Sequence, residues 1–272
     1  MTGSTRTGSA RRRAGSSPRL LGLLGLAGFA VLVEVLPRIG LLPARYFPTT
    51  TAILGALVDY AGDGRFWTAL GQTLRTWVVG LLIAVVAGVV VGVVIGAVPV
   101  LRALTASTIE FLRPIPSVAL IPLVIVLLGS GMSGTLVLVV YASFWQVLVQ
   151  VLHGVADVDP VARDTAHAYH LGFGYRVRYV VWPTALPYAV TGFRLATAVA
   201  LILTITGELT IGTPGLGKLM DTAYNSGDDG VPSVYAIVVV TGLIGVIANN
   251  ATRAAERYVL AWHPAVRAEL PA

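Results

Sequence analysis

Few side chains in this sequence are placed to do chemistry. His167 and His170 stand three residues apart, so on a helix both imidazoles could reach one metal ion. No third ligand stands at a matching spacing, and no serine, histidine and carboxylate fall into a nucleophile pattern. We therefore expect no metal site, no cofactor and no catalysis from this chain.

A glycine-rich segment at Gly212 to Leu219, GTPGLGKL, is similar to the phosphate-binding pattern GxxxxGK[ST]. It departs at the last position, where Leu219 replaces the hydroxyl that holds magnesium. It also follows an apolar segment of helical length instead of a strand. We expect a glycine-rich turn here, so any energy from ATP must come from another protein.

The composition is that of a membrane protein. Hydrophobic residues make up 56% of the chain and charged residues 12%, with a mean hydropathy of +0.80, whereas soluble domains carry about 25% charged residues. Because lipid tolerates only helices and closed barrels, and the apolar runs do not alternate, we expect an all-α membrane protein with six transmembrane helices. The six runs lie at about residues 20–36, 77–98, 105–128, 134–152, 188–207 and 233–250.

Arginine is concentrated on one side of this topology, in the N-terminal residues, the loop at 156–190 and the C-terminal segment. The positive-inside rule therefore places both termini and that loop in the cytoplasm of a multi-pass cell-membrane protein. We expect residues 1–18 to be a disordered basic tail and residues 19–272 to be one transmembrane domain. The basic residues are spread among loop ends, which argues against nucleic-acid binding. The absence of cysteine excludes disulfides.

The loop between the fourth and fifth spans is too polar for lipid. Asp159 and Pro160 suit the N-cap and first position of a short helix. Gly172 should end that helix, and a second basic and aromatic piece should follow until Pro183 and Pro187 stop it. We predict two short helices joined by a glycine turn.

Outside this loop, three patterns predict local structure. We expect an amphipathic helix at about Thr50 to Tyr60. Gly88, Gly92 and Gly96 share one helix face, which predicts close packing against a neighbouring helix. The prolines at 114, 116 and 122 predict a broken third span.

Polar residues and helix-breaking prolines within apolar spans are candidates to line a water-filled path through the membrane. For Arg113 an equal alternative is that it reaches the cytoplasmic surface, and Glu208 could instead cap the glycine-rich turn. Threonines also bond their own helix backbone. The candidates are Arg113, Pro114, Pro116, Tyr141, Gln146, Thr204 and Glu208.

The polar loop resembles the EAA loop of permeases in binding-protein-dependent ABC importers. Its matching positions, with those that follow it, are Asp164, Thr165, Ala166, His170, Leu171, Gly172, Trp182, Pro183, Ala185, Leu186, Pro187, Gly192, Arg194, Leu195 and Ala196. Further matches are YFPT at 46–49, TLR at 73–75, FLRPIP at 111–116, and Glu208 ahead of GLG at 215–217. Together they cover nearly the whole chain and are similar to the nitrate, sulfonate and taurine subgroup.

In that family the loop is a coupling helix that inserts into a cleft of a cytoplasmic ATPase. The resemblance implies such ATPase subunits, an external solute-binding protein and a homodimer of permeases. It implies polar edges at Arg163 and Asp164, and an apolar contact by Ala166, Tyr169, Leu171 and Phe173. The full set of expected coupling residues is Arg163, Asp164, Thr165, Ala166, Tyr169, His170, Leu171, Gly172, Phe173, Pro183, Leu186 and Pro187.

Two positions depart from the family pattern. Asp164 stands where the family has glutamate, and this keeps the charge on a shorter side chain. His170 stands where the family has glycine, which removes a conformationally permissive residue. We expect Gly172, two positions later, to supply the turn instead.

The function that the resemblance implies is inward transport of a small anionic or zwitterionic solute, such as nitrate, a sulfonate or taurine. The alternative is a self-sufficient channel or secondary transporter that needs no ATPase. A structural or regulatory membrane subunit is a third class. The first two differ in whether the chain alone moves solute.

Overall fold

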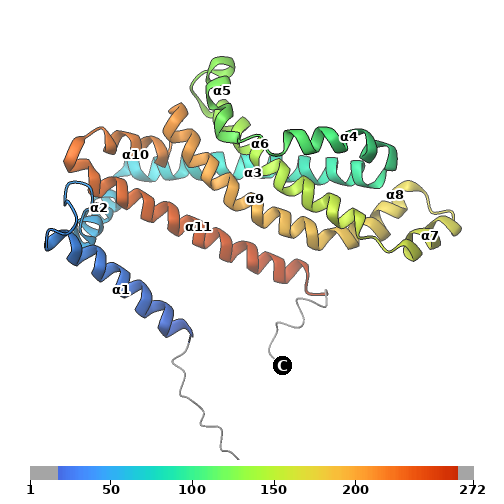
Figure 1. The fold of residues 1–272 in the computed structure, drawn as a ribbon, viewed down its shortest axis with the longest axis horizontal. Coiled ribbons are helices and arrows are strands. Elements are labelled where there is room, and N and C mark those ends of the chain that lie inside the picture. The colour runs from blue at the N-terminus through green and yellow to red at the C-terminus, as the bar shows by residue number, and fades with distance from the viewer. Residues whose placement is uncertain (1–17, 263–272) are drawn as a thin grey trace, which may run out of the picture.

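A computed structural model describes residues 18–262, and this part of the chain is built from helices (Figure 1). The predicted tail at 1–18 lies almost entirely outside it. Within the described residues, five helical segments are long and apolar enough to cross a membrane. They contain α1 (Pro18–Arg38), α3 (Gly64–Ala97), α6 (Met132–Ala156), α9 (Trp182–Ile211) and α11 (Val231–Val259).

The predicted third span is a bent pair of helices instead of one rod. Helix α4 (Pro99–Leu112) is followed by a 3₁₀ turn, η1 (Ser117–Leu120), and by α5 (Ile121–Leu128), with a bend of 81° between the two parts. Pro114 and Pro116 fall at the break, where each removes a backbone donor and crowds the carbonyl four residues earlier. The described residues therefore hold six spans only if the bent pair counts as one.

The centre of the molecule is the packing of α3 and α9 on α6. Glycines of α3 face valines of α6, and a Cβ built on Gly92 would lie 2.8 Å from the Val151 side chain. Gly88 and Gly96 meet Val147 and Val155 in the same way. The predicted close helix packing is thus confirmed, because only a hydrogen at these positions leaves room for the partner.

The amphipathic helix expected near Thr50 is α2 (Thr50–Gly62), capped by the Thr49 hydroxyl. The next residue, Asp63, caps α3 by accepting a hydrogen bond of 2.9 Å from the Arg65 N–H. This bond holds the pKa of the Asp63 carboxyl below its usual value. Figure 1 shows α1 in contact with α2 and splayed away from the central helices.

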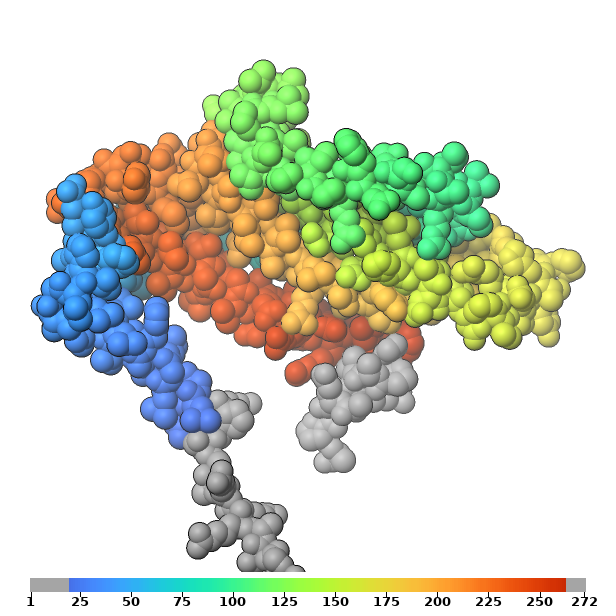
Figure 2. Space-filling view, viewed as in Figure 1, coloured from blue at the N-terminus to red at the C-terminus, as the bar shows by residue number. Residues whose placement is uncertain are grey.

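The two ends of the long helices carry different structures (Figure 1). At one end lie α2, the short helix α10 (Leu216–Tyr224) and a 3₁₀ turn, η3 (Gly227–Gly230). At the other lie α7 (Pro160–Ala168) and α8 (Phe173–Arg176), which form the polar loop of the sequence. The space-filling view in Figure 2 shows this loop projecting beyond the central helices, and α5 projecting from their side.

Candidate coupling loop and translocation residues

Helix α7 begins where the sequence predicts. The Asp159 carboxylate accepts a hydrogen bond of 2.7 Å from the Val161 N–H, and Pro160 occupies the first helical turn. An acceptor at the N-cap followed by proline satisfies one exposed donor and removes another. The start of the loop is therefore fixed by local chemistry.

Helix α7 ends differently from our expectation. His170 adopts the left-handed conformation with φ 53°, while Gly172 has φ −60° and ψ 159°. The Leu171 N–H donates to the Ala166 carbonyl at 3.0 Å and the His170 N–H to the His167 carbonyl at 2.9 Å. This pair of bonds is the Schellman motif. The prediction that Gly172 supplies the turn was wrong, because the two bonds force the left-handed residue to be the one at 170.

The second half of the loop is also not a separate short helix. From Phe173 the chain runs helically through α8, a π-helical segment η2 (Val177–Val181) and α9, so Pro183 and Pro187 do not stop it. The Trp182 N–H donates to the Val177 carbonyl five residues back. Pro183 follows this widened turn, in the first turn of α9. Because proline has no backbone N–H, no carbonyl is needed to accept from it there.

The loop residues differ sharply in exposure. Tyr169 is 78% exposed, and Leu171 and Phe173 are exposed as well. Ala166, expected in the same apolar contact, is only 4% exposed and packs inside its own chain. The other expected coupling residues that are exposed are Arg163, Asp164, Thr165, His170 and Gly172, and the half-buried ones are Pro183, Leu186 and Pro187.

The two histidines of the loop are used separately. A guanidinium nitrogen of Arg176 lies 2.7 Å from Nε2 and 3.0 Å from Nδ1 of His167. His170 closes the Schellman motif through its backbone. Among residues 18–262, no three histidine, aspartate or glutamate side chains group as metal ligands.

Glu208 lies at a junction of three helices and is completely buried. Its Oε2 atom accepts hydrogen bonds of 2.9 Å from the Thr73 hydroxyl of α3 and from the Gly217 N–H of α10. The Thr73 oxygen in turn accepts a bond of 2.8 Å from the Leu216 N–H. Glu208 therefore binds the glycine-rich turn, one of the two alternatives open from the sequence.

The glycines of that turn permit this junction. A Cβ on Gly215 would lie 2.2 Å from the Glu208 carboxyl, and one on Gly217 would lie 2.5 Å from the Ile205 carbonyl. Gly212, with φ 82°, ends α9. The segment that resembles a phosphate-binding loop thus directs its Gly217 donor to an internal carboxyl.

Two of the other path candidates donate hydrogen bonds to backbone carbonyls of the described chain. The Thr204 hydroxyl donates to the Ala200 carbonyl at 2.8 Å, and the Tyr141 hydroxyl to the Leu112 carbonyl at 2.8 Å. Gln146 is half-buried on α6. Arg113, Pro114 and Pro116 are exposed at the α4–α5 break, and Arg113 forms no ion pair with any described residue.

Sequence reasoning missed several structural features of the two ends. Thr73 belongs to the TLR motif, but nothing in that motif identifies it as the partner of Glu208. Thr135 and Thr213 share a hydrogen bond of 2.7 Å that ties α6 to the same turn.

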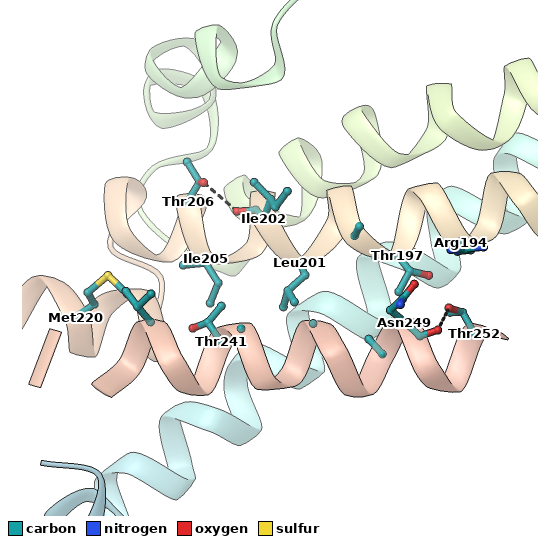
Figure 3. A pocket seen from close by; sticks show the side chains of 15 residues that line it. Arg194, Thr197, Leu201, Ile202, Ile205, Thr206, Met220, Thr241, Asn249 and Thr252 are labelled. Atoms are coloured by element: carbon teal, nitrogen blue, oxygen red, sulfur yellow. Dashed lines mark hydrogen bonds between the residues drawn. The ribbon is translucent and has the colours of Figure 1, made fainter. Parts of the chain in front are cut away.

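A groove of about 520 Å³ between α9 and α11 is lined by Leu201, Ile205 and Thr241, with Arg194 and Asn249 at one end (Figure 3). No sequence spacing marks these contacts, since each joins distant segments.

A family model described as a binding-protein-dependent transport system inner membrane component matches residues 80–260. The chain belongs to this family. The taurine transport system permease protein TauC of Escherichia coli (strain K12) is 28% identical over 252 residues, covering 90% of this chain and 91% of that protein. The bicarbonate transport system permease protein CmpB of Synechococcus elongatus is 25% identical over 251 residues, covering 89% of each chain.

The fold of this chain is similar to that of a chain in a solved structure of the MetNI methionine ABC transporter in an inward-facing conformation. The TM-score is 0.62 at 18% sequence identity, over 71% of this chain and 95% of that chain. The resemblance to nitrate, sulfonate and taurine permeases drawn from the sequence is confirmed. The chain is a multi-pass permease of an ABC transport system.

Proposed function

We propose that this permease forms the membrane path of an ABC importer and takes its energy from a separate ATPase that docks on the α7–α8 loop. An external binding protein delivers the solute, and two copies of the chain enclose the path. The observation that carries this proposal is the loop itself. It projects from one end of the molecule and joins the central helices α6 and α9 (Figure 1). Its aromatic side chains Tyr169 and Phe173 are exposed.

The docking surface is made of the exposed face of α7 and its turn. Tyr169, Leu171 and Phe173 offer apolar area, with Arg163 and Asp164 as polar edges. A few buried anchors, most often aromatic residues or arginine, carry most of the binding energy in protein interfaces, about 2 kcal/mol or more each. Ala166 supports the surface from behind, because it is buried.

Movement of a docked ATPase would reach the path through two connections. Helix α7 follows α6 after a short turn, and the loop returns through η2 into α9 without leaving helical structure. Since α6 and α9 pack along each other, a push on α7 tilts both. Termini and loop on the cytoplasmic side agree with this arrangement, as the positive-inside rule predicts.

The α4–α5 break supports a dimer with the path between the copies. Irregular backbone at membrane depth occurs where protein or a water-filled cavity covers it. In this chain Arg113, Pro114 and Pro116 at the break are exposed, as are Val126 and Leu127 of the projecting α5. We propose that a second copy covers α5 and that the break faces the path, with Gln146 nearby on α6.

The solute class follows from Arg113 and from the relatives. An exposed guanidinium without an acidic partner among the described residues suits a solute with a negative group. The two relatives are named for taurine and bicarbonate, which both carry one. A small anionic or zwitterionic solute is therefore proposed.

Co-purification tests the docking surface. Tyr169→Glu should abolish association with the partner ATPase, while insertion into the membrane is retained. Tyr224→Glu is the matched control, since Tyr224 is 73% exposed on α10 at the opposite end of the helices. Normal ATPase recovery with Tyr169→Glu would show that docking takes place elsewhere.

Reconstitution tests the need for an ATPase. The purified chain alone in liposomes should take up no taurine or bicarbonate, because transport requires the motor. Uptake by the chain alone would instead support the self-sufficient channel or secondary transporter.

A further inference from the structure

The inner side of the coupling loop encloses a pocket of about 250 Å³. It lies between α7, the first residues of the helix that begins at Phe173, and the adjoining ends of α3 and α6. Its polar lining is Arg163, His167 and Arg176, and the rest of the lining is apolar or glycine and proline. This volume is below the range of about 300–1,000 Å³ of drug-sized ligand sites, so only a small group fits.

The charge of this pocket has one sign. No acidic side chain lines it within the described part of the chain. The nearest carboxylates in sequence are engaged elsewhere or exposed: Asp157 accepts from the Tyr188 hydroxyl at 2.9 Å, Asp159 caps α7, and Asp164 is exposed on α7. Two guanidinium groups and an imidazole therefore face one cavity without a compensating anion.

Arg176, which lines this pocket, is not fully satisfied by the protein. The Nε atom of Arg176 is buried and makes no hydrogen bond to any residue of the described range, while a terminal nitrogen of the same guanidinium contacts His167. A buried charged donor without a partner is destabilising. An oxyanion in the pocket would neutralise the positive charge of Arg176 and Arg163, since the planar arginine fork matches the oxygens of phosphate and sulfate.

We propose that this pocket binds a tetrahedral oxyanion, either a free phosphate or sulfate or the phosphate of an anionic lipid headgroup. The anion would accept hydrogen bonds from Arg176 and Arg163 and join α7 to the helix behind it. Bound anion would thus fix the position of α7. Its effect on transport rests on the proposed docking of an ATPase, whereas the binding itself does not.

The test measures binding by the purified full-length chain without an ATPase. In neutral phosphatidylcholine nanodiscs, inorganic sulfate and phosphate are titrated while thermal unfolding is followed. A second arm replaces part of the lipid with phosphatidylglycerol. In whichever arm shows stabilisation, Arg176→Gln should raise the anion or phosphatidylglycerol concentration needed for half of it on the order of tenfold or more. Arg178→Gln, an exposed arginine outside the pocket lining, should leave it unchanged.

Each outcome decides the proposal. A response to free anions in neutral nanodiscs assigns a soluble ligand, and a response only with phosphatidylglycerol assigns the lipid headgroup. Equal weakening by the Arg176 and Arg178 variants, or no response in either arm, overturns the site. Arg163→Gln serves as a second variant if Arg176→Gln does not fold. Because no ATPase is present, failure here leaves the proposed function standing, and the reverse also holds.

Discussion

Replacing His170 by glycine should stabilise the end of α7. His170 has φ 53°, and a non-glycine residue held in the left-handed region is destabilised by about 1–3 kcal/mol. Its side chain makes no hydrogen bond with the described residues, so nothing of that kind is lost. Glycine also makes the unfolded chain more flexible, which offsets about 0.4–1 kcal/mol. The expected net gain is about 1 kcal/mol in the local opening of the turn.

Hydrogen exchange of the purified chain measures this gain. The informative amides are those of His170 and Leu171, which donate to the His167 and Ala166 carbonyls and close the turn. A gain of about 1 kcal/mol should slow their exchange roughly fivefold. The effect is local, so the midpoint of global unfolding should change little.

Two further variants separate backbone strain from other effects. His170→Ala removes the imidazole but keeps a Cβ in the left-handed region, so exchange should not slow. Ala168→Gly places glycine at a helical position of α7 and should speed exchange, because glycine costs about 1 kcal/mol relative to alanine there. Faster exchange in His170→Gly, or equal slowing by His170→Ala, would refute the assignment of strain to residue 170.

Three other changes test the remaining structure by thermal unfolding or exchange. Glu208→Ala should lower stability by at least about 2 kcal/mol, because buried donors such as the Thr73 hydroxyl lose their acceptor. Glu208→Gln should lower stability less, and equal losses from the two variants would contradict the role of Glu208 at this junction. Gly92→Ala should lose about 1–3 kcal/mol by overpacking, whereas Gly71→Ala, with open space around it, should not lose stability. Asp159→Ala should speed exchange in the first turn of α7 by removing a cap worth about 1 kcal/mol, and unchanged exchange would exclude that role.

Features fixed by neighbouring residues could be predicted from the sequence. The start of α7 at Asp159 and Pro160, helix α2 and the glycine face of α3 all follow local rules of capping and spacing. The positions of the five long apolar helices were predicted, but their lengths were underestimated, and the third predicted span is a bent pair. Helix α3 begins at Gly64 instead of near 77, because its first turns are too polar for a hydropathy criterion yet still helical.

Features fixed by distant residues could not be predicted. Glu208 meets Thr73 across 135 positions, so the sequence left open whether its carboxyl lines a path or binds the turn. The burial of Ala166 likewise depends on how the loop folds back on the bundle. For His170, the family pattern indicated glycine at the correct position, and the error lay in assuming that the chain would move the turn to a glycine nearby.

The failed prediction at Pro183 and Pro187 has a mechanical consequence. Proline ends a helix when the lost hydrogen bond and the ring contact cannot be accommodated, but here the π segment Val177–Val181 widens the backbone just before Pro183. The helix therefore continues without ending, and the Thr184 hydroxyl of α9 donates a bond of 3.0 Å to the Val180 carbonyl of the π segment. A separate short helix joined by a slack connection would absorb a push on α7. A continuous helix passes it to α9, as the proposed coupling to an ATPase requires.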